Sequence, residues 1–534
     1  MDYIYTLFQF PTVLFAILVA LLICAFSKKL VSSRSQSGGV PEAGGAWPII
    51  GHLHLFSSKE ILYRTLYALS VKYGPVFSLR LGSHKALVVG NSEMAKEILT
   101  IHDKAFATRP SLSASKLLGY DYAMFGFAPY GSYWREMRKI TTLELLSNHR
   151  LDMFNFRQIR ASEVHIGIKD LYETWTSKGS GAESGVLVDM KQWFADLTHN
   201  MAFRIVVGKR YYGATAHSAD EGEARQCQKS IKEYFHLFGA FVLSDAIPFL
   251  GWLDVGGHKK AMKRIAEELD VFVQGWLDEH KRKRLSDGER KEDQDFMDVM
   301  LTVTEDAKLN GFDIDADTIT KATCLNLILG AADSNMVPLI WGLALLLNNP
   351  HTLRKAKEEV ATHVGKDRHV EESDIKNLVY LQAVVKETLR LYPPSPILAL
   401  RAAMEDCTLS NGYRVTPGTR LLLNAWQIHH DERVWTNPNE FKPERFLTTH
   451  KELDLKGQNF ELLPFGAGRR ACSGVSLALQ VIHLSLASVL HCFELETPDN
   501  KGVDMTESPS LANVKATPLH VLLKPRLSPQ LYNL

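Results

Sequence analysis

The chain has 534 residues, of which 46% are hydrophobic, so it can bury a large core. Its formal net charge of +1 argues against nucleic acid as a partner. Its six cysteines form no C-x-x-C pair and no disulfide framework, which suits a reducing, cytosolic compartment and argues against a zinc site.

The first predicted element is the uncharged apolar stretch at residues 4–26, which is long enough to span a bilayer. Basic side chains follow it and only Asp2 precedes it, so the positive-inside rule leaves the bulk of the chain in the cytoplasm. A cleaved signal peptide is the alternative, but no basic side chain precedes the run. We predict a membrane anchor at 1–30, a linker and hinge at 31–52, and one catalytic domain at 53–534. A plain linker is an equally open interpretation of 31–52.

Two strands and a helix are predicted next. Residues 76–82 and 85–89 have the pattern of two strands joined by a turn at 82–84. Trp134 and Arg138 lie four apart on one helical face, where both side chains can reach the same anion. Taken alone, such a pair is more often an ordinary surface pair.

Residues 234–253 are rich in aromatic side chains and are broken by glycines and Pro248. Core packing is one interpretation of this segment. The other is a loop between helices that touches the membrane and admits apolar substrates. Residues 281–294 carry dense charge and are predicted to form a solvated linker.

Residues 318–347 predict a long apolar helix, with Asp315 or Asp317 as its N-cap. Its polar centre argues against a second membrane span and favours a buried helix that crosses a cofactor pocket. Pro338 has no N–H to donate to the carbonyl of Ser334, so we predict a kink there.

Residues 374–391 predict another helix, in which Glu387 and Arg390 lie three apart on one face. Charged pairs decorate most helices, so this spacing alone is weak evidence.

The most informative stretch is residues 464–474, a glycine-punctuated loop that contains Cys472 and precedes an apolar helix predicted at 475–490. A thiolate is most easily held at such a place, since free backbone N–H groups and the helix dipole face it. Gly466 and Gly468 allow tight turns, and Arg470 adds a cation two residues from the sulfur. The arrangement suits an axial ligand of haem iron with the arginine on a propionate. A lone buried cysteine is the alternative.

The same loop fits F-x-x-G-x-R-x-C-x-G, the signature of the cytochrome P450 superfamily, which the whole chain resembles. The motifs at residues 128–131 and 443–446 make it similar to plant endoplasmic-reticulum enzymes that oxidise alkaloids, terpenoids and phenolics. The implied fold is mostly α with a small β-rich part, the two enclosing haem b.

The resemblance implies a role for each matching residue. Cys472 would be the axial ligand of the haem iron, and Asp333 and Ser334 would relay protons. Other haem contacts would be Phe465, Gly466, Arg470, Trp134, Arg138 and Arg401. The substrate pocket would include Asn326, Leu329, Gly330, Ala331, Ile397 and Leu398. A buried structural network would join Glu387, Arg390 and Arg445.

The chain departs from the family pattern at four positions. Ser334 replaces a threonine, Asn335 stands where a second threonine is usual in plants, and Pro338 replaces a helix former or threonine. Leu400 replaces the proline that usually precedes the arginine at 401.

The implied activity is a monooxygenase that inserts one atom of O₂ into a small lipophilic plant metabolite. Electrons would come from NADPH through an FAD- and FMN-containing reductase, with the protein held by one span in the endoplasmic reticulum membrane and facing the cytosol. One alternative is a haem-thiolate enzyme of rearrangement, desaturation or dehydration, which would be marked by loss of the acid–hydroxyl pair. A silent haem protein, such as a sensor or electron carrier, is the other.

Overall fold

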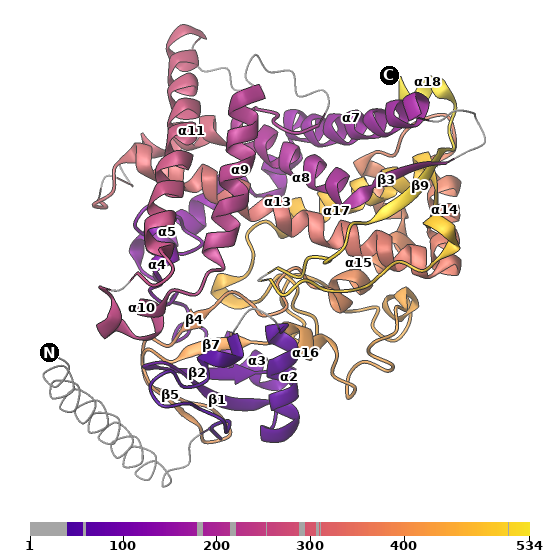
Figure 1. The fold of residues 1–534 in the computed structure, drawn as a ribbon. Helices are drawn as coiled ribbons and strands as arrows, with labels where there is room; N and C mark the ends of the chain where they lie inside the picture. The colour runs from indigo at the N-terminus through magenta and orange to yellow at the C-terminus, as the bar shows by residue number, and fades with distance from the viewer. Residues whose placement is uncertain are drawn as a thin grey trace, which may run out of the picture.

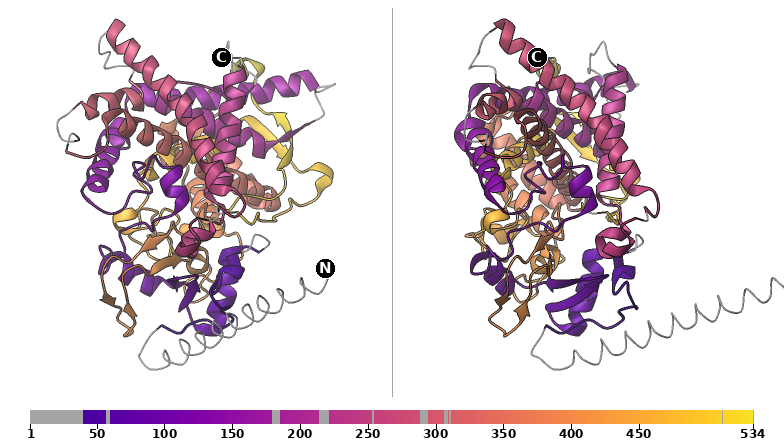
Figure 2. Two further views of the ribbon diagram at one scale, coloured as in Figure 1. Left: turned by 60° about the vertical axis from the view of Figure 1, so that its left-hand side comes forward. Right: turned by 90° about the vertical axis from the view of Figure 1, so that its left-hand side faces the viewer.

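The computed structural model describes residues 40–56, 60–178, 185–213, 221–252, 254–287, 294–305, 309, 311–510 and 512–533. The predicted membrane anchor at 1–30 and the first part of the linker lie outside these residues. Figure 1 and both views in Figure 2 place the sheet that contains β1 and β2 at one end of the molecule, with the helices making up the rest.

Helices form most of the described chain. The α-helices are α2 (Leu62–Tyr73), α3 (Ser92–Thr100), α4 (Ser113–Leu117), α5 (Ser132–Ile140), α6 (Asn148–Leu151), α7 (Phe154–Lys178), α8 (Met190–Val207), α9 (Glu221–Phe238), α10 (Leu243–Ala246), α11 (His258–Asp287), α12 (Phe296–Thr304), α13 (Ala316–Asn348), α14 (Pro350–Val364), α15 (Val379–Leu391), α16 (Ala425–His429), α17 (Val475–Cys492) and α18 (Pro529–Tyr532). Short 3₁₀ segments are η1 (Leu53–Phe56), η3 (Pro248–Leu250), η4 (Glu372–Asn377), η5 (Pro443–Phe446), η6 (Gly468–Arg470) and η7 (Pro498–Asn500), and η2 (Thr141–Leu145) is a π-helical turn.

The strands are few and short. They are β1 (Val76–Leu81), β2 (His84–Val89), β3 (Val186–Asp189), β4 (Arg401–Ala402), β5 (Cys407–Thr408), β6 (Arg414–Val415), β7 (Arg420–Leu423), β8 (Phe493–Glu496) and β9 (His520–Pro525). They form a four-stranded sheet in the order β1-β2-β7-β4, a three-stranded sheet β3-β9-β8 and the pair β5-β6. The mostly α architecture with a small β-rich part therefore agrees with the prediction.

α13 runs through the middle of the helical part and packs against α8, α12, α15 and α17 (Figure 1). Its N-cap is Asp315, whose carboxylate accepts a hydrogen bond of 2.9 Å from the N–H of Thr318. The helix is continuous through Pro338, and the kink stays a prediction. Among the described residues, α13 and α17 are long and apolar enough to cross a membrane, but most of each lies buried in the protein. Both are core helices.

Two apolar cores meet at the loop that contains Cys472. Phe465 packs against the large core of the helical part. Ala467 belongs to the core on the sheet, together with Leu421 and Leu423 of β7. Packing against both cores therefore fixes the loop, which suits a role of Cys472 that requires one fixed position.

The strand hairpin was predicted to within one residue. β1 and β2 pair from Val76 opposite Val89 to Leu81 opposite His84, so the turn is Gly82-Ser83 and not 82–84. Gly82 has φ of +62°, a conformation that favours glycine.

Residues 374–391 form two elements rather than one helix, since η4 ends at Asn377 and α15 begins at Val379. The Glu359 carboxylate of α14 accepts hydrogen bonds from the backbone N–H groups of Tyr380 and Leu381. Such capping by a distant residue starts a new helix at a point that the local sequence does not mark.

Residues 281–294 were predicted to be a linker, but α11 continues to Asp287. The charged side chains hold the helix through ion pairs such as that of Lys281 with Asp317, which has an N–O distance of 2.7 Å. A dense charge run with partners on neighbouring elements can therefore remain helical.

Candidate active site

The loop that contains Cys472 is held by its own backbone. The N–H of Cys472 donates to the carbonyl of Phe465 at 2.9 Å, and the N–H of Gly474 lies 3.3 Å from the Cys472 sulfur. Gly466 and Gly468 have φ of +67° and +69°. A Cβ on Gly468 would lie 2.4 Å from a carboxylate oxygen of Asp103, so only glycine fits this turn.

Cys472 lies just before α17, as predicted, and its side chain is exposed. The surrounding protein nevertheless desolvates the thiol and raises its pKa, although the N–H of Gly474 and the charge of Arg138 oppose this. Burial therefore opposes the effect expected from the helix dipole, and the thiolate ligand stays a prediction. A metal cation at the sulfur would remove the proton.

Four arginines lie around this loop: Arg109, Arg138, Arg401 and Arg470. Burial and the charges of the other three lower the pKa of Arg470 to about 8. Burial and Arg401 lower the pKa of Arg109 to about 9. These pKa values are lowered because the cations are held close together and out of water.

Arg470 is positioned by three elements. Its guanidinium donates to the carbonyls of Ala107 and Ala128 at 2.6 Å each, and it lies 4.2 Å from the centre of the Trp134 ring. Trp134 on α5 is buried, and its face supports Arg470 through a cation–π contact. The structure thus adds a direct Trp134–Arg470 contact, and the sharing of one anion by Trp134 and Arg138 stays a prediction. Arg138 is half-buried, on the same helix.

Arg401 begins β4 and reaches the same loop despite Leu400 before it. It donates to the carbonyl of Ala467 at 2.8 Å and forms an ion pair of 3.2 Å with Asp103. Asp103 also pairs with Arg469, which points to the exterior.

Arg109 and Asp103 were missed by the sequence analysis. Arg109 donates to the carbonyls of Gly126, Ala399 and Leu400, which ties three segments together beside the loop. Its only local signal is Pro110 after it, which stiffens the backbone. No sequence pattern marks Asp103. In the sequence, a single aspartate that is buried in a short turn looks the same as one that is exposed to solvent.

The charges of the site fit haem. Among the described residues, Asp103 is the one carboxylate paired with any of the four arginines. A buried excess of positive charge is costly unless an anion neutralises it. The two propionates of haem b would supply two negative charges, and Cys472 would supply the axial sulfur. The residues present therefore suit this group.

Helix α13 presents an accessible stripe in the middle of an otherwise buried helix. Gly330 and Ser334 are exposed, while Asn326, Ala331 and Asp333 are half-buried. These positions recur every three to four residues and so lie on one face. The predicted polar and small residues are thus brought together on one accessible face of α13.

The hydroxyl of Ser334 donates to the carbonyl of Gly330 at 2.6 Å, within its own helix. Asp333 faces α8, where its carboxylate lies 3.8 Å from Nε2 of His199. Burial raises the pKa of Asp333, and the nearby His199 lowers it. Asn335 is buried on another face, and its side-chain oxygen finds no partner in the described chain.

The other predicted pocket residues come from two segments. Asn326 accepts a hydrogen bond of 2.9 Å from the N–H of Gly126, which anchors the loop before α5 to α13. Leu329 is buried. Leu398 lies near the glycine at 466, beside the Cys472 loop, whereas Ile397 packs against the smaller core under β1 and β2. Ile397 therefore takes part in core packing, in addition to its predicted place in the substrate pocket.

The three residues of the predicted network are in contact and fully buried. Arg390 donates to Glu387 through Nε at 2.7 Å and Nη2 at 2.9 Å, and Arg445 donates through Nε at 2.9 Å. The N–H of Lys442 donates to the same carboxylate at 2.9 Å. Arg390 also donates to the carbonyl of His429, so the network joins α15 to the end of α16.

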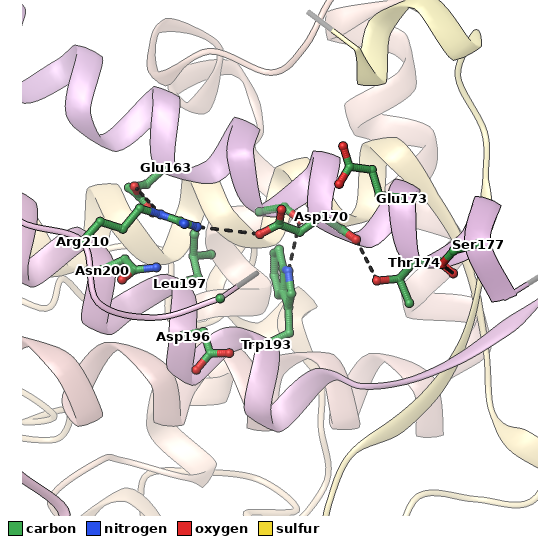
Figure 3. Close-up of a pocket in the computed structure, with 12 residues that line it drawn as sticks. Glu163, Asp170, Glu173, Thr174, Ser177, Trp193, Asp196, Leu197, Asn200 and Arg210 are labelled. Carbon is green, nitrogen blue, oxygen red and sulfur yellow. Dashed lines mark hydrogen bonds and ion pairs between the residues drawn. The ribbon is translucent and has the colours of Figure 1, made fainter. Parts of the chain in front are cut away.

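A separate cavity of about 460 Å³ lies between α7 and α8 (Figure 3). Glu163, Asp170, Asp196 and Arg210 are among its lining residues, and Arg210 pairs with both Glu163 and Asp170. None of the predicted haem contacts is among the residues that line it.

Known proteins resemble this chain over nearly its whole length. The sequence model of the cytochrome P450 family matches residues 41–523. Strychnine-10-hydroxylase of Strychnos nux-vomica is 55% identical, over 92% of each chain. Demethylepipodophyllotoxin synthase of Sinopodophyllum hexandrum is 54% identical, over 92% of this chain and 93% of that protein.

Two further relatives extend the comparison. Xanthotoxin 5-hydroxylase CYP82C4 of Arabidopsis thaliana is 50% identical, over 98% of this chain and 99% of that one. A zebrafish cytochrome P450 structure with progesterone superposes with a TM-score of 0.70 at 26% identity, covering 87% of this chain and 99% of that one.

Proposed function

The chain belongs to the cytochrome P450 family and is a monooxygenase, and on that premise we propose that it oxidises a small lipophilic metabolite of plants. The observation that supports the residue assignment is the Cys472 loop with its partly buried excess of arginine charge. Gly126 links this group to the stripe of α13, because its carbonyl accepts from Arg109 and its N–H donates to Asn326. Haem b, when bound, supplies the activation of O₂. Relatives named for hydroxylating strychnine and xanthotoxin support an alkaloid or phenolic substrate.

The protein's own residues hold the group and manage protons. Cys472 would ligate the iron, and Arg470, Arg138 and Arg401 would neutralise the propionates. Asp333 would take up and release protons, since its carboxyl is partly desolvated beside a histidine. Ser334 would turn its hydroxyl from the Gly330 carbonyl to hold a water between Asp333 and O₂. Electrons would come from NADPH through a flavoprotein reductase.

Replacing Ser334 by alanine tests this proton relay. We expect the product formed per NADPH consumed to fall about fivefold, as for loss of one hydrogen bond of ~1 kcal/mol, while substrate still binds. The wasted NADPH should appear as hydrogen peroxide. Ser334→Thr is the control and should keep normal coupling, because it retains the hydroxyl. Unchanged coupling in Ser334→Ala would remove this residue from the mechanism and favour a rearrangement or desaturation.

The apolar surface at one end of the molecule supports membrane attachment. Residues 234–252 divide into a first part that includes the buried Tyr234 and a second part in which Phe249 and Trp252 are 70% and 79% exposed. Trp47 and Ile49 of the proposed hinge are exposed too. Ala246 and Ile50 both accept hydrogen bonds from the β1–β2 turn, so the two apolar groups lie at the same end. We propose that this end rests on the endoplasmic reticulum membrane, to which residues 1–30 anchor the chain.

A truncated protein that lacks residues 1–29 should still bind lipid vesicles. Replacing Phe249 and Trp252 by serine in that protein should weaken binding at least about tenfold, since each aromatic side chain is worth ~1.5–3 kcal/mol when buried. Vesicle co-sedimentation measures this. Leu285→Ser is the matched control, because this leucine is 88% exposed on α11 and outside the apolar end. Equal loss in both variants, or no binding by the truncated protein, would contradict the proposal.

A further inference from the structure

Asp333 has one ion-pair partner in the described part of the chain, His199 of α8. The two helices pack side by side, and the imidazole is buried between them. The distance of 3.8 Å from Nε2 to Oδ1 is longer than a hydrogen bond. The contact therefore acts through charge and leaves the carboxyl free to turn.

The other ring nitrogen of His199 is already committed. Nδ1 lies 2.7 Å from the carbonyl oxygen of Ala195, which can only accept, so Nδ1 carries a hydrogen. Nε2 is therefore the nitrogen that gains and loses a proton, and it is the one that faces Asp333.

The surroundings of His199 contain few other charges. Asp196 lies one turn earlier on α8, and the two side chains interact electrostatically. The ring of Tyr212 lies 4.8 Å from the imidazole, and beyond it lies Cys227 of α9. Burial raises the pKa of Tyr212 and raises that of Cys227 to about 12, so both stay neutral. Within the part of the chain that the structure describes, Asp333 and Asp196 are the charged groups that interact with His199.

Asp196 of α8 interacts with His199 and also lines the cavity between α7 and α8. Asp196 and Asn200 line it, and His199 lies between them in the sequence of α8 (Figure 3). Burial raises the pKa of Asp196, so its carboxyl can accept a proton more readily than an exposed one. His199 is therefore influenced by two carboxyl groups, Asp333 on α13 and Asp196 beside the cavity.

We propose that His199 is a positioning residue that controls the protonation of Asp333. The proposal rests on the proton-relay role assigned above to Asp333. In the transfer, Nε2–H of the imidazolium gives its proton to the Asp333 carboxylate, which leaves neutral imidazole and a carboxylic acid. A hydronium ion from solvent then protonates Nε2 again and becomes water, so both protons and charge balance.

The first test is spectroscopic and needs no turnover. Holoenzyme with labelled histidine is titrated as its diamagnetic reduced carbon monoxide complex, and the signal lost in His199→Gln identifies His199. In Asp333→Asn the titration midpoint of His199 should fall, because a nearby carboxylate favours the imidazolium. Reciprocally, infrared titration should show the Asp333 carboxyl with a midpoint raised by a similar amount in His199→Gln.

His483→Gln is the matched control. His483 of α17 is also buried and also has Nδ1 against the carbonyl four residues back, at 2.6 Å from Leu479. Burial lowers its pKa to about 4, so its loss changes packing without changing charge. This variant should leave both midpoints unchanged. Midpoints of Asp333 and His199 that do not respond to each other would overturn the proposal.

The second test separates this proposal from the proton relay itself. Product formed per NADPH should fall at high pH as Asp333 loses its proton, and His199→Gln should move that fall to higher pH by about the same amount as the infrared midpoint. A merely structural role would lower activity equally at every pH and would overturn the proposal. If Asp333→Asn keeps full coupling at every pH, the relay fails, while the spectroscopic midpoints still decide whether the pair is coupled.

Discussion

Replacing Cys472 by serine should abolish the strongly red-shifted absorption of the reduced carbon monoxide complex. A thiolate ligand gives that electronic state, and a hydroxyl in the same place does not. The remaining arginines should still retain some haem, because they bind the propionates and not the iron. The measurement is the difference spectrum of purified protein, with haem content determined separately.

Cys407→Ser is the control for this variant. Cys407 lies on β5 and is half-buried, outside the Cys472 loop, so its loss should leave the band at full intensity. Should Cys472→Ser keep the band while Cys407→Ser loses it, the ligand assignment would be wrong.

The elements around Cys472 could be predicted because their signals are local. The apolar periodicity of α17, the glycines of the loop and the aspartate cap of α13 all act within a few residues. Local physical rules therefore gave α13 to within two residues at its start and placed Cys472 directly before a helix.

The electrostatic surroundings could not be predicted in the same way. Arg109, Asp103 and His199 are single charged or titratable residues on separate elements, and each acquires its role through a neighbour far away in the sequence. Cys472 shows the same limit: burial by distant segments raises the pKa of a thiol that the local helix dipole would lower. Sequence patterns describe chain neighbours, whereas desolvation depends on the whole fold.

Removing the carboxylate of Glu387 should prevent the protein from folding with haem. Two guanidiniums, from Arg390 and Arg445, are buried against it, and each would lose its negative partner. Breaking a buried ion pair costs about 3–5 kcal/mol. That is a large fraction of the ~5–15 kcal/mol by which a domain is stable. We expect Glu387→Ala to be recovered mainly as haem-free or aggregated protein.

The effect should be specific to the buried carboxylate. Glu440 belongs to the same region and its backbone carbonyl accepts from Arg390, but its side chain is exposed. Glu440→Ala should therefore keep haem content and thermal stability near those of the parent protein, as measured by the Soret absorption during heating. Well-folded Glu387→Ala with a full complement of haem and merely slower turnover would mean that the network serves catalysis and not the fold. The position of the network favours a structural role. It joins α15 to the segments around His429 and Lys442, away from the α13 stripe that carries Asp333.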